Sequence, residues 1–315
     1  MHKELNRPIF VVGSPRSGTS ILTWCLGHHP NIFPVPESNW MGDFAVNVAL
    51  AYRVGAARDY YSILSAMDIP NDELFAAFGR SINDLILDHR KNLETKRETK
   101  CIELKLDRRW LDASGTAAGP KTRWVDGTPE YSFHICALRK LFPQALFVHL
   151  FRDLRAVIRS MVNFHRVAGF QLVANEEDAY RYWMRTVRAC TLAEQAYGPT
   201  VVHRIRYADL INHPEATMRA LLKFLDEPYV DKCLEPLELR INSSFLGHDD
   251  VDTEGSPVDA AVVAEATQFF AQLEGTVQPN EASPAAALEI ESAFRERMTC
   301  VAPRAVAHQA RKSTV

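Results

Sequence analysis

The sequence predicts an α/β fold: an open parallel sheet flanked by helices, with a helical insertion and a helical C-terminal region. Two apolar runs, at residues 8–12 and 145–151, lack the polar alternation of a half-exposed strand, so we expect both to be buried parallel strands. The first run ends at Gly13 and is followed by a turn-forming loop and then by apolar residues at helical spacing. Strand, glycine loop and helix in this order are typical of folds that bind an anionic ligand at the carboxyl edge of the sheet.

The other elements follow from hydrophobic spacing along the chain. Residues from about 39 to 95 carry two apolar helical faces, and we expect them to form an insertion that covers a site. Beyond it, the pattern predicts a short strand at 124–125, helices at 130–142, after 153 and at 179–197, a strand at 201–207, and a helix at 214–225. The crossovers are long enough for parallel pairing.

The length of 315 residues fits two domains or one α/β domain with an insertion. We expect a single domain over residues 1–300. The stretch 301–315 has few apolar anchors and is expected to be a flexible tail.

Composition excludes several classes of protein. Hydrophobic residues make up 47% of the chain, which excludes a disordered protein. With 36 basic and 39 acidic residues the net charge is −3, which argues against a nucleic-acid binder. We find no signal peptide and no run near the roughly 18 apolar residues of a membrane span. The six cysteines lack metal-ligand and redox spacing, so we expect buried thiols, no metal and a cytoplasmic location. The oligomeric state, including a homo-oligomer, stays open.

The glycine loop has the spacing of a P-loop, G-x-x-x-x-G-K-[ST], but lacks its lysine. Gly13 and Gly18 keep the spacing, Thr19 occupies the lysine position, and Arg16 supplies a cation in mid-loop. The backbone N–H groups of residues 17–20 can cradle one phosphate at a helix N-terminus. This arrangement disfavours hydrolysis of ATP or GTP. The alternative is an ordinary strand-to-helix turn.

A second anion site is expected after the run at 145–151. Arg152 closes that strand, and Ser160 lies eight positions later, about two helical turns on. The fork of arginine donors and a serine hydroxyl suit a phosphate. Asp153 is expected to be structural, as a helix N-cap or in an ion pair. The alternative for Arg152 is a solvated charged face.

Four segments together resemble a known family. Residues 15–20 resemble the 5'-phosphosulfate loop of sulfotransferases that use 3'-phosphoadenosine 5'-phosphosulfate (PAPS), and residues 152–160 resemble their 3'-phosphate motif. The steps at 128–129 (Thr-Pro) and 142–143 (Phe-Pro) and the segment 206–211 occur in the family's order. The resemblance covers roughly residues 7–37 and 122–226. It is closest to tyrosylprotein and bacterial carbohydrate or small-molecule sulfotransferases, which carry Arg in the loop.

The resemblance implies transfer of a sulfuryl group from PAPS to an acceptor hydroxyl of a sugar, a phenol or a natural product. Adenosine 3',5'-bisphosphate would be the product, and no metal would be needed. The residues implied in binding the donor are Pro15, Arg16, Ser17, Gly18, Thr19, Ser20, Arg152 and Ser160. Tyr207 is expected either to contact adenine or to be a tyrosine at the rim of the core.

The family subgroup uses a carboxylate base shortly after the loop helix, and Glu37 stands there, 21 residues after Arg16. It follows a Pro-rich turn that should bring the chain back over the loop, where a carboxylate can take a proton from an acceptor hydroxyl. Arg16 would stabilise charge on the leaving phosphate. Alternatively, Glu37 is an acidic residue that stabilises a helix N-terminus. In that case a histidine would be the base. Those histidines are His134, His149 and His165, of which His149 is expected to be a hydrogen-bonded core residue.

One position departs from the family pattern. Many relatives have Lys just before the Thr-Pro step, where this chain has Gly127. Stabilisation of the leaving group then falls on Arg16 and the loop N–H groups, or on a cation from elsewhere, such as Lys105, Arg108 or Arg109. Two other functions stay open: a P-loop kinase or NTPase, and a relative that binds the nucleotide without catalysis.

Overall fold

Five parallel strands form the sheet of the computed structural model, which describes residues 7–103, 121–238 and 258–312. The sheet order is β2-β3-β1-β4-β5. The strands are β1 (Ile9–Val12), β2 (Ile32–Pro34), β3 (Arg123–Asp126), β4 (Leu146–Phe151) and β5 (Val202–Arg206). The predicted open parallel α/β sheet is confirmed.

Strand β1 lies in the middle of the sheet, paired with β3 on one side and β4 on the other. Ile9 is opposite Val125 of β3 and Leu146 of β4, and Val12 is opposite His149. Because all the pairings are parallel, the carboxyl ends of these three strands meet at one edge of the sheet. The glycine loop and Arg152 both leave the sheet there.

Fourteen α-helices and three 3-10 turns are described. They are α1 (Thr19–Gly27), α2 (Met41–Ala56), η1 (Asp59–Tyr61), α3 (Ile63–Ala66), α4 (Asn71–Asp88), α5 (Arg90–Glu103), η4 (Pro129–Phe133), α6 (Ile135–Leu141), α7 (Leu154–Val162), α8 (His165–Ala168), α9 (Glu176–Tyr197), α10 (Tyr207–Asn212), α11 (Pro214–Phe224), η5 (Asp231–Leu234), α12 (Glu235–Glu238), α13 (Ala260–Gly275) and α14 (Pro284–Lys312).

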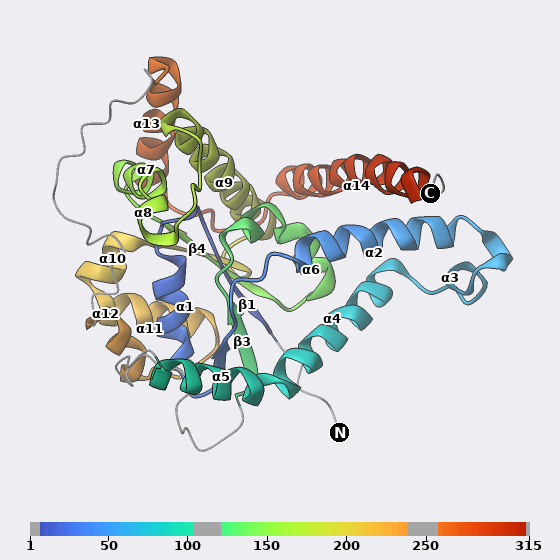
Figure 1. The fold of residues 1–315 in the computed structure, drawn as a ribbon, viewed down its shortest axis with the longest axis horizontal. Helices are drawn as coiled ribbons and strands as arrows, with labels where there is room; N and C mark the ends of the chain where they lie inside the picture. The colour runs from blue at the N-terminus through green and yellow to red at the C-terminus, as the bar shows by residue number, and fades with distance from the viewer. Residues whose placement is uncertain (1–6, 104–120, 239–257, 313–315) are drawn as a thin grey trace.

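The helices cover both faces of the sheet, and successive strand residues face different layers (Figure 1). Ile9 and Val11 pack with α1, α11 and η5, whereas Phe10 and Val12 pack with α2, α4, α6, α9 and α14. A third cluster joins α7, α9 and α13 beyond Phe151. Each β1 side chain is fully buried, which explains why its sequence has no polar alternation.

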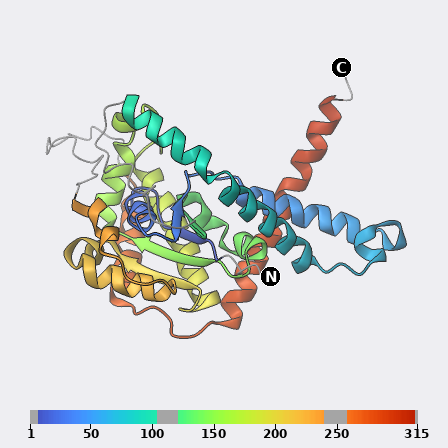
Figure 2. The same cartoon turned by 90° about the horizontal axis from the view of Figure 1, so that it is seen from below.

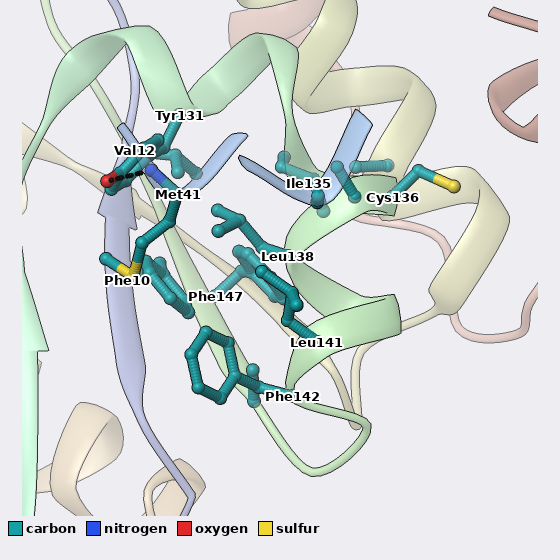
Figure 3. Packing of buried hydrophobic residues seen from close by; sticks show 14 of the residues in the cluster. Phe10, Val12, Met41, Tyr131, Ile135, Cys136, Leu138, Leu141, Phe142 and Phe147 are labelled. Atoms are coloured by element: carbon teal, nitrogen blue, oxygen red, sulfur yellow. Dashed lines mark hydrogen bonds between the residues drawn. The ribbon is translucent and has the colours of Figure 1, made fainter. Parts of the chain in front are cut away.

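Aromatic rings fill the core on the face of Phe10 (Figure 3). The Phe10 ring stacks on Phe147 with centroids 5.3 Å apart, and it meets Trp124 edge-on at 5.4 Å. At the upper end of this core, Met41 N–H donates to the Tyr131 hydroxyl at 3.3 Å. The start of α2 is therefore tied to η4.

The predicted insertion corresponds to α2, η1, α3, α4 and α5, which lie between β2 and β3. Helices α2 and α4 run out from the sheet side by side and form an arm that projects from the molecule (Figures 1 and 2). Phe75 on α4 is buried at the base of the arm, whereas Tyr60 and Tyr61 at its tip are 82% and 92% exposed.

Three elements differ from the sequence prediction. The Pro-rich turn before Glu37 contains a strand, β2, which is only three residues long and lies at the sheet edge, where proline is tolerated. The helix expected at 130–142 is divided at His134 into η4 and α6. Helix α14 continues to Lys312, within the stretch expected to be a tail, and residues 313–315 lie outside the described chain.

No helix among the described residues is long and apolar enough to cross a membrane. Four cysteines whose side chains the structure describes are buried and form no disulfide: Cys25, Cys136, Cys190 and Cys233.

A buried ion cluster links β4, α9 and β5. His149 Nδ1 lies 2.5 Å from Glu194 Oε1, and Arg204 Nε donates to both Glu194 carboxylate oxygens at 3.0 Å. His149 and Glu194 are fully buried. Burial alone would lower the pKa of His149, but its contacts with Cys190 and Glu194 outweigh burial and raise that pKa to about 10. The expectation of a hydrogen-bonded core histidine is confirmed.

The cluster predicts a pH-dependent stability. A raised His149 pKa stabilises the fold fully below its unfolded value of about 6.5, and this stability is lost as pH rises toward about 10. The free energy of unfolding should therefore fall by up to about 1.4 kcal/mol per pH unit above pH 7. Glu194→Gln should lower the free energy of unfolding by about 3 to 5 kcal/mol at pH 6, because an uncompensated buried charge remains. It should also flatten the slope, because one of the groups that raise the His149 pKa is lost. Urea unfolding from pH 6 to 9.5 measures both, and an unchanged slope in the variant would contradict the assignment.

Candidate active site

The loop between β1 and α1 requires glycine at both ends. Gly13 has a φ of 150°, and a Cβ there would lie 2.2 Å from the Leu150 carbonyl oxygen. Gly18 has a φ of 105°, and a Cβ there would lie 2.6 Å from the ring of Tyr207. The P-loop spacing thus follows from close packing against β4 and α10.

The interior of the loop is a tight turn. Ser17 donates to the Ser14 carbonyl oxygen through its backbone N–H at 3.1 Å and through its hydroxyl at 2.6 Å. Arg16, in mid-turn, has a φ of 71°, in the left-handed region that side chains rarely adopt. Such strain persists only where surrounding contacts hold it, and it concentrates at functional sites.

Arg16, Arg152 and Ser160, from the two expected anion sites, lie together and form one group, the anion cluster. Arg16 Nε donates to Ser160 Oγ at 3.0 Å, and Arg152 Nη1 donates to the Arg16 carbonyl oxygen at 3.3 Å. Residues separated by 136 to 144 positions in the sequence therefore surround one point at the sheet edge. Burial, followed by repulsion from Arg152, lowers the pKa of Arg16. Helix α7 begins here with Asp153 as its N-cap, accepting from Ala156 N–H at 2.8 Å, as one of the two expectations had it.

Aromatic rings support both guanidinium groups. Arg152 lies 4.5 Å from the centroid of Tyr207, and Arg16 lies 4.9 Å from that of Phe164. Tyr207 is the first residue of α10 and is wedged between Arg152 and Gly18. It therefore packs directly against the anion cluster.

Helix α1 adds partial positive charge to the same place. It begins at Thr19, directly after the loop, and its first turn contains no acidic residue. No side chain of the described residues caps its N-terminus. The backbone N–H groups of the first turn of α1 can therefore bind an anion at the positive end of the helix dipole.

Glu37 lies beside the start of α1. Its Oε1 accepts a hydrogen bond from Ser20 Oγ at 3.2 Å. Solvent reaches Glu37, but the surrounding protein covers enough of the carboxylate to raise its pKa, and Glu130 adds to the rise, while Ser20 and Arg16 oppose it. β2 therefore brings the chain back to the loop. The Glu37 carboxylate, with its raised pKa, lies there beside the anion cluster.

Ser132 is a site residue that sequence reasoning missed. Its hydroxyl accepts from Gly13 N–H at 2.9 Å and donates to the Gly13 carbonyl oxygen at 3.2 Å. Both bonds cross 119 positions of sequence, so no local pattern marks them. They fix the start of the loop to η4.

Gly127 packs closely against α1. A Cβ at this position would lie 2.2 Å from Thr23 Oγ1. Thr23 therefore fills the space that a side chain at 127 would need. The other cations considered for this role, Lys105, Arg108 and Arg109, lie outside the described residues.

The three candidate histidines contact other parts of the chain. His149 belongs to the buried cluster with Glu194. His134 packs against Gly42 and Arg297, and burial, with repulsion from Arg297, lowers its pKa to about 4. His165 is exposed on α8, with its Nδ1 3.0 Å from the carbonyl oxygen of Val162. Glu37 is thus the candidate base that the structure brings to the loop.

Comparison with known proteins identifies sulfotransferases as relatives. The model of the sulfotransferase family matches residues 8–231. The chain is 25% identical over 236 residues to protein-tyrosine sulfotransferase 1 of Danio rerio, covering 73% of this chain and 56% of that protein. It is 31% identical over 104 residues to the omega-hydroxy-beta-dihydromenaquinone-9 sulfotransferase of Mycobacterium tuberculosis, covering 31% and 27%. The chain therefore spans little more than half the length of the Danio rerio relative.

Among solved structures, a sulfotransferase from Mycobacterium avium matches with a TM-score of 0.45 and 18% identity, covering 89% of this chain and 79% of that one. A sulfotransferase domain from the curacin biosynthetic pathway matches with a TM-score of 0.43 and 18% identity, covering 91% and 97%.

The contact between Gly127 and Thr23 predicts a coupled pair of substitutions. Gly127→Ala should lower the free energy of unfolding by about 1 to 3 kcal/mol, because the new methyl group overlaps Thr23 Oγ1. Thr23→Ala should recover most of that loss, since Oγ1 has no hydrogen-bond partner within the described part of the chain. Chemical denaturation of both single variants and the double variant measures the coupling. Strictly additive effects would show that the two residues do not compete for space.

Proposed function

Because the chain belongs to the sulfotransferase family, whose model matches residues 8–231, we propose that it transfers a sulfuryl group from PAPS to an acceptor hydroxyl. The observation that carries this proposal is the convergence of Arg16, Arg152 and Ser160 on the N-terminus of α1. The PAPS donor carries the sulfuryl group and leaves adenosine 3',5'-bisphosphate. Two guanidinium groups, a hydroxyl and a helix N-terminus suit a ligand with separate anionic groups.

We assign the donor-binding role to residues 15–20, Arg152, Ser160 and Tyr207. The N–H groups of residues 18–20 and the Arg16 side chain would hold the 5'-phosphosulfate, since the Ser17 N–H already donates to the Ser14 carbonyl oxygen. Arg152 and Ser160 would hold the 3'-phosphate, the group that distinguishes this donor from ATP. Tyr207, already packed against Arg152, would contact the nucleoside.

Glu37 would act as the general base. A carboxylate of raised pKa is a stronger proton acceptor while it is ionised, and Ser20 holds Oε1 beside α1. Its proton would come from the acceptor hydroxyl as that oxygen bonds to sulfur. Arg16 and the loop N–H groups would stabilise the charge that develops on the leaving phosphate as its bond to sulfur breaks.

We further propose a small-molecule or carbohydrate acceptor and a cytoplasmic location. The names of two relatives specify a protein tyrosine and a hydroxylated menaquinone, so a hydroxyl group is what those acceptors share. Four buried, unpaired thiols fit a reducing compartment.

Donor selectivity tests the assignment of Arg152. Calorimetric titration should show tight binding of adenosine 3',5'-bisphosphate and weak binding of ATP with Mg²⁺. Arg152→Ala should weaken bisphosphate binding by about 10- to 150-fold, because one charge-assisted phosphate contact contributes about 1.5 to 3 kcal/mol. Binding of adenosine 5'-phosphate serves as the control and should change little. Equal losses for both nucleotides would contradict a 3'-phosphate site, and tight binding of ATP would point to a kinase or NTPase.

Glu37→Gln separates catalysis from binding. The variant should keep its affinity for adenosine 3',5'-bisphosphate while sulfuryl transfer falls by about 100-fold or more, as removal of a general base does. In the unsubstituted protein the transfer rate should fall as pH drops through the Glu37 pKa, which lies above the ordinary range of glutamate. The measurement uses ³⁵S-labelled PAPS with 4-nitrophenol and chitotriose as acceptors. A variant with undiminished transfer would show that Glu37 is not the base.

A further inference from the structure

Asp126 is the last residue of β3, and its carboxylate is fully buried close to the segment that carries Glu37, the proposed base. Its Oδ1 accepts from Thr128 N–H at 2.9 Å and from Thr128 Oγ1 at 2.5 Å. Its Oδ2 accepts from Ser38 Oγ at 3.1 Å. Ser38 is the residue that follows Glu37, so this carboxylate reaches the segment that carries the base.

The protons in this network have one consistent direction. Backbone amides only donate, so Ser38 N–H donates to Thr128 Oγ1 at 3.0 Å and Met41 N–H donates to the Tyr131 hydroxyl. Thr128 Oγ1 must then give its own proton to Asp126. The Tyr131 hydroxyl lies 3.0 Å from Ser38 Oγ and donates to it, which leaves the Ser38 proton for Asp126. The hydrogen bonds of the network all lead to the Asp126 carboxylate, which accepts three of them.

The same network joins the base to the donor loop. Thr128 directly precedes η4 and Tyr131 lies within it. Ser132, the residue after Tyr131, bonds to both backbone polar groups of Gly13. Glu37 is therefore fixed through Ser38 to η4, and η4 is fixed to the loop. Ser20, on the opposite side, contacts the Glu37 carboxylate itself.

We propose that Asp126 and Thr128 are positioning residues that hold Glu37 in register with the donor loop. The inference rests on Glu37 being the base of the proposed function. Neither residue contacts the reacting groups. Both act by removing the freedom of the Glu37–Ser38 backbone, and a displacement of about 1 Å in a catalytic group can cost on the order of 100-fold in rate.

The charges around Glu37 agree with this role. Burial, its largest cause, raises the pKa of Asp126 to about 6, so the carboxyl is mostly ionised at neutral pH, as the hydrogen-bond directions require. The charged groups that face Glu37 are Arg16 from the loop, Asp126 from β3 and Glu130 from η4. Removal of the Asp126 charge should lower the pKa of Glu37, because a nearby anion disfavours ionisation.

Substitution of Thr128 tests the positioning. Thr128→Val keeps the shape but removes the hydroxyl that accepts from Ser38 N–H and donates to Asp126. We expect transfer to 4-nitrophenol or chitotriose to fall about 10- to 100-fold at saturating substrates, with the affinity for adenosine 3',5'-bisphosphate changed less than about 3-fold. Thr128→Ser restores the hydroxyl and is the matched control, with a rate within about 3-fold of the unsubstituted protein. Equal rates for the two variants, or a loss of nucleotide affinity equal to the loss of rate, would overturn the proposal.

A second measurement needs no acceptor and no turnover. The carboxyl ¹³C resonance that disappears in Glu37→Gln reports the titration of the base directly. In Asp126→Asn this resonance should titrate at lower pH, whereas in Thr128→Ser it should titrate as in the unsubstituted protein. Ser38→Ala, at an exposed position, serves if Asp126→Asn does not fold. It removes one bond to Asp126 and should also shift the resonance, and no shift in either variant would overturn the proposal. A protein that binds the bisphosphate but transfers nothing would refute the proposed function, while the titration would still decide whether Asp126 acts on the Glu37 carboxylate.

Discussion

The parallel pairing of β1 between β3 and β4 is the constraint on which the rest of the molecule depends. It sends three chain segments off the same edge of the sheet: the glycine loop after Val12, the Thr-Pro turn after Asp126 and the Arg152 segment after Phe151. The apolar side chains of β1 are buried on both faces, so a slip of the register would move them all to the wrong layer. The chemistry at this edge is therefore held in place by the core.

Local signals predict much of this fold. Continuous apolar runs identified β1 and β4, and the spacing of Gly13 and Gly18 identified the loop. β2 was not predicted, because a three-residue edge strand that ends in Pro34 has neither the length nor the composition of a typical strand. The contact between the residues of the two expected anion sites was not predicted either, since a bond between Arg16 and Ser160 spans 144 positions and leaves no pattern in the sequence.

The residues that sequence reasoning missed share a physical character. Ser132, Asp126 and Thr23 are short polar side chains that each contact a residue far away in the chain. Their roles depend on where the strand ends meet, and an isolated Ser or Thr carries no such information. Gly127 illustrates the converse. Against the family pattern it is a missing lysine, whereas in the structure it is the close contact that lets β3 approach α1.

The arm between β2 and β3 has a consequence for how this chain can diverge. Neighbouring strands of the sheet are joined through more than eighty residues, from Pro34 to Arg123, most of which lie outside the sheet. The entropy of closing such a connection rises only logarithmically, by roughly 0.6 kcal/mol for each doubling of its length. Phe75 and Met41 pack in the core at the base of the arm, so this part is bound to the sheet. The exposed tip around Tyr60 and Tyr61 is not, and lengthening or shortening it costs the sheet almost nothing. The tip is therefore the part that evolution can exchange while the strand ends stay fixed.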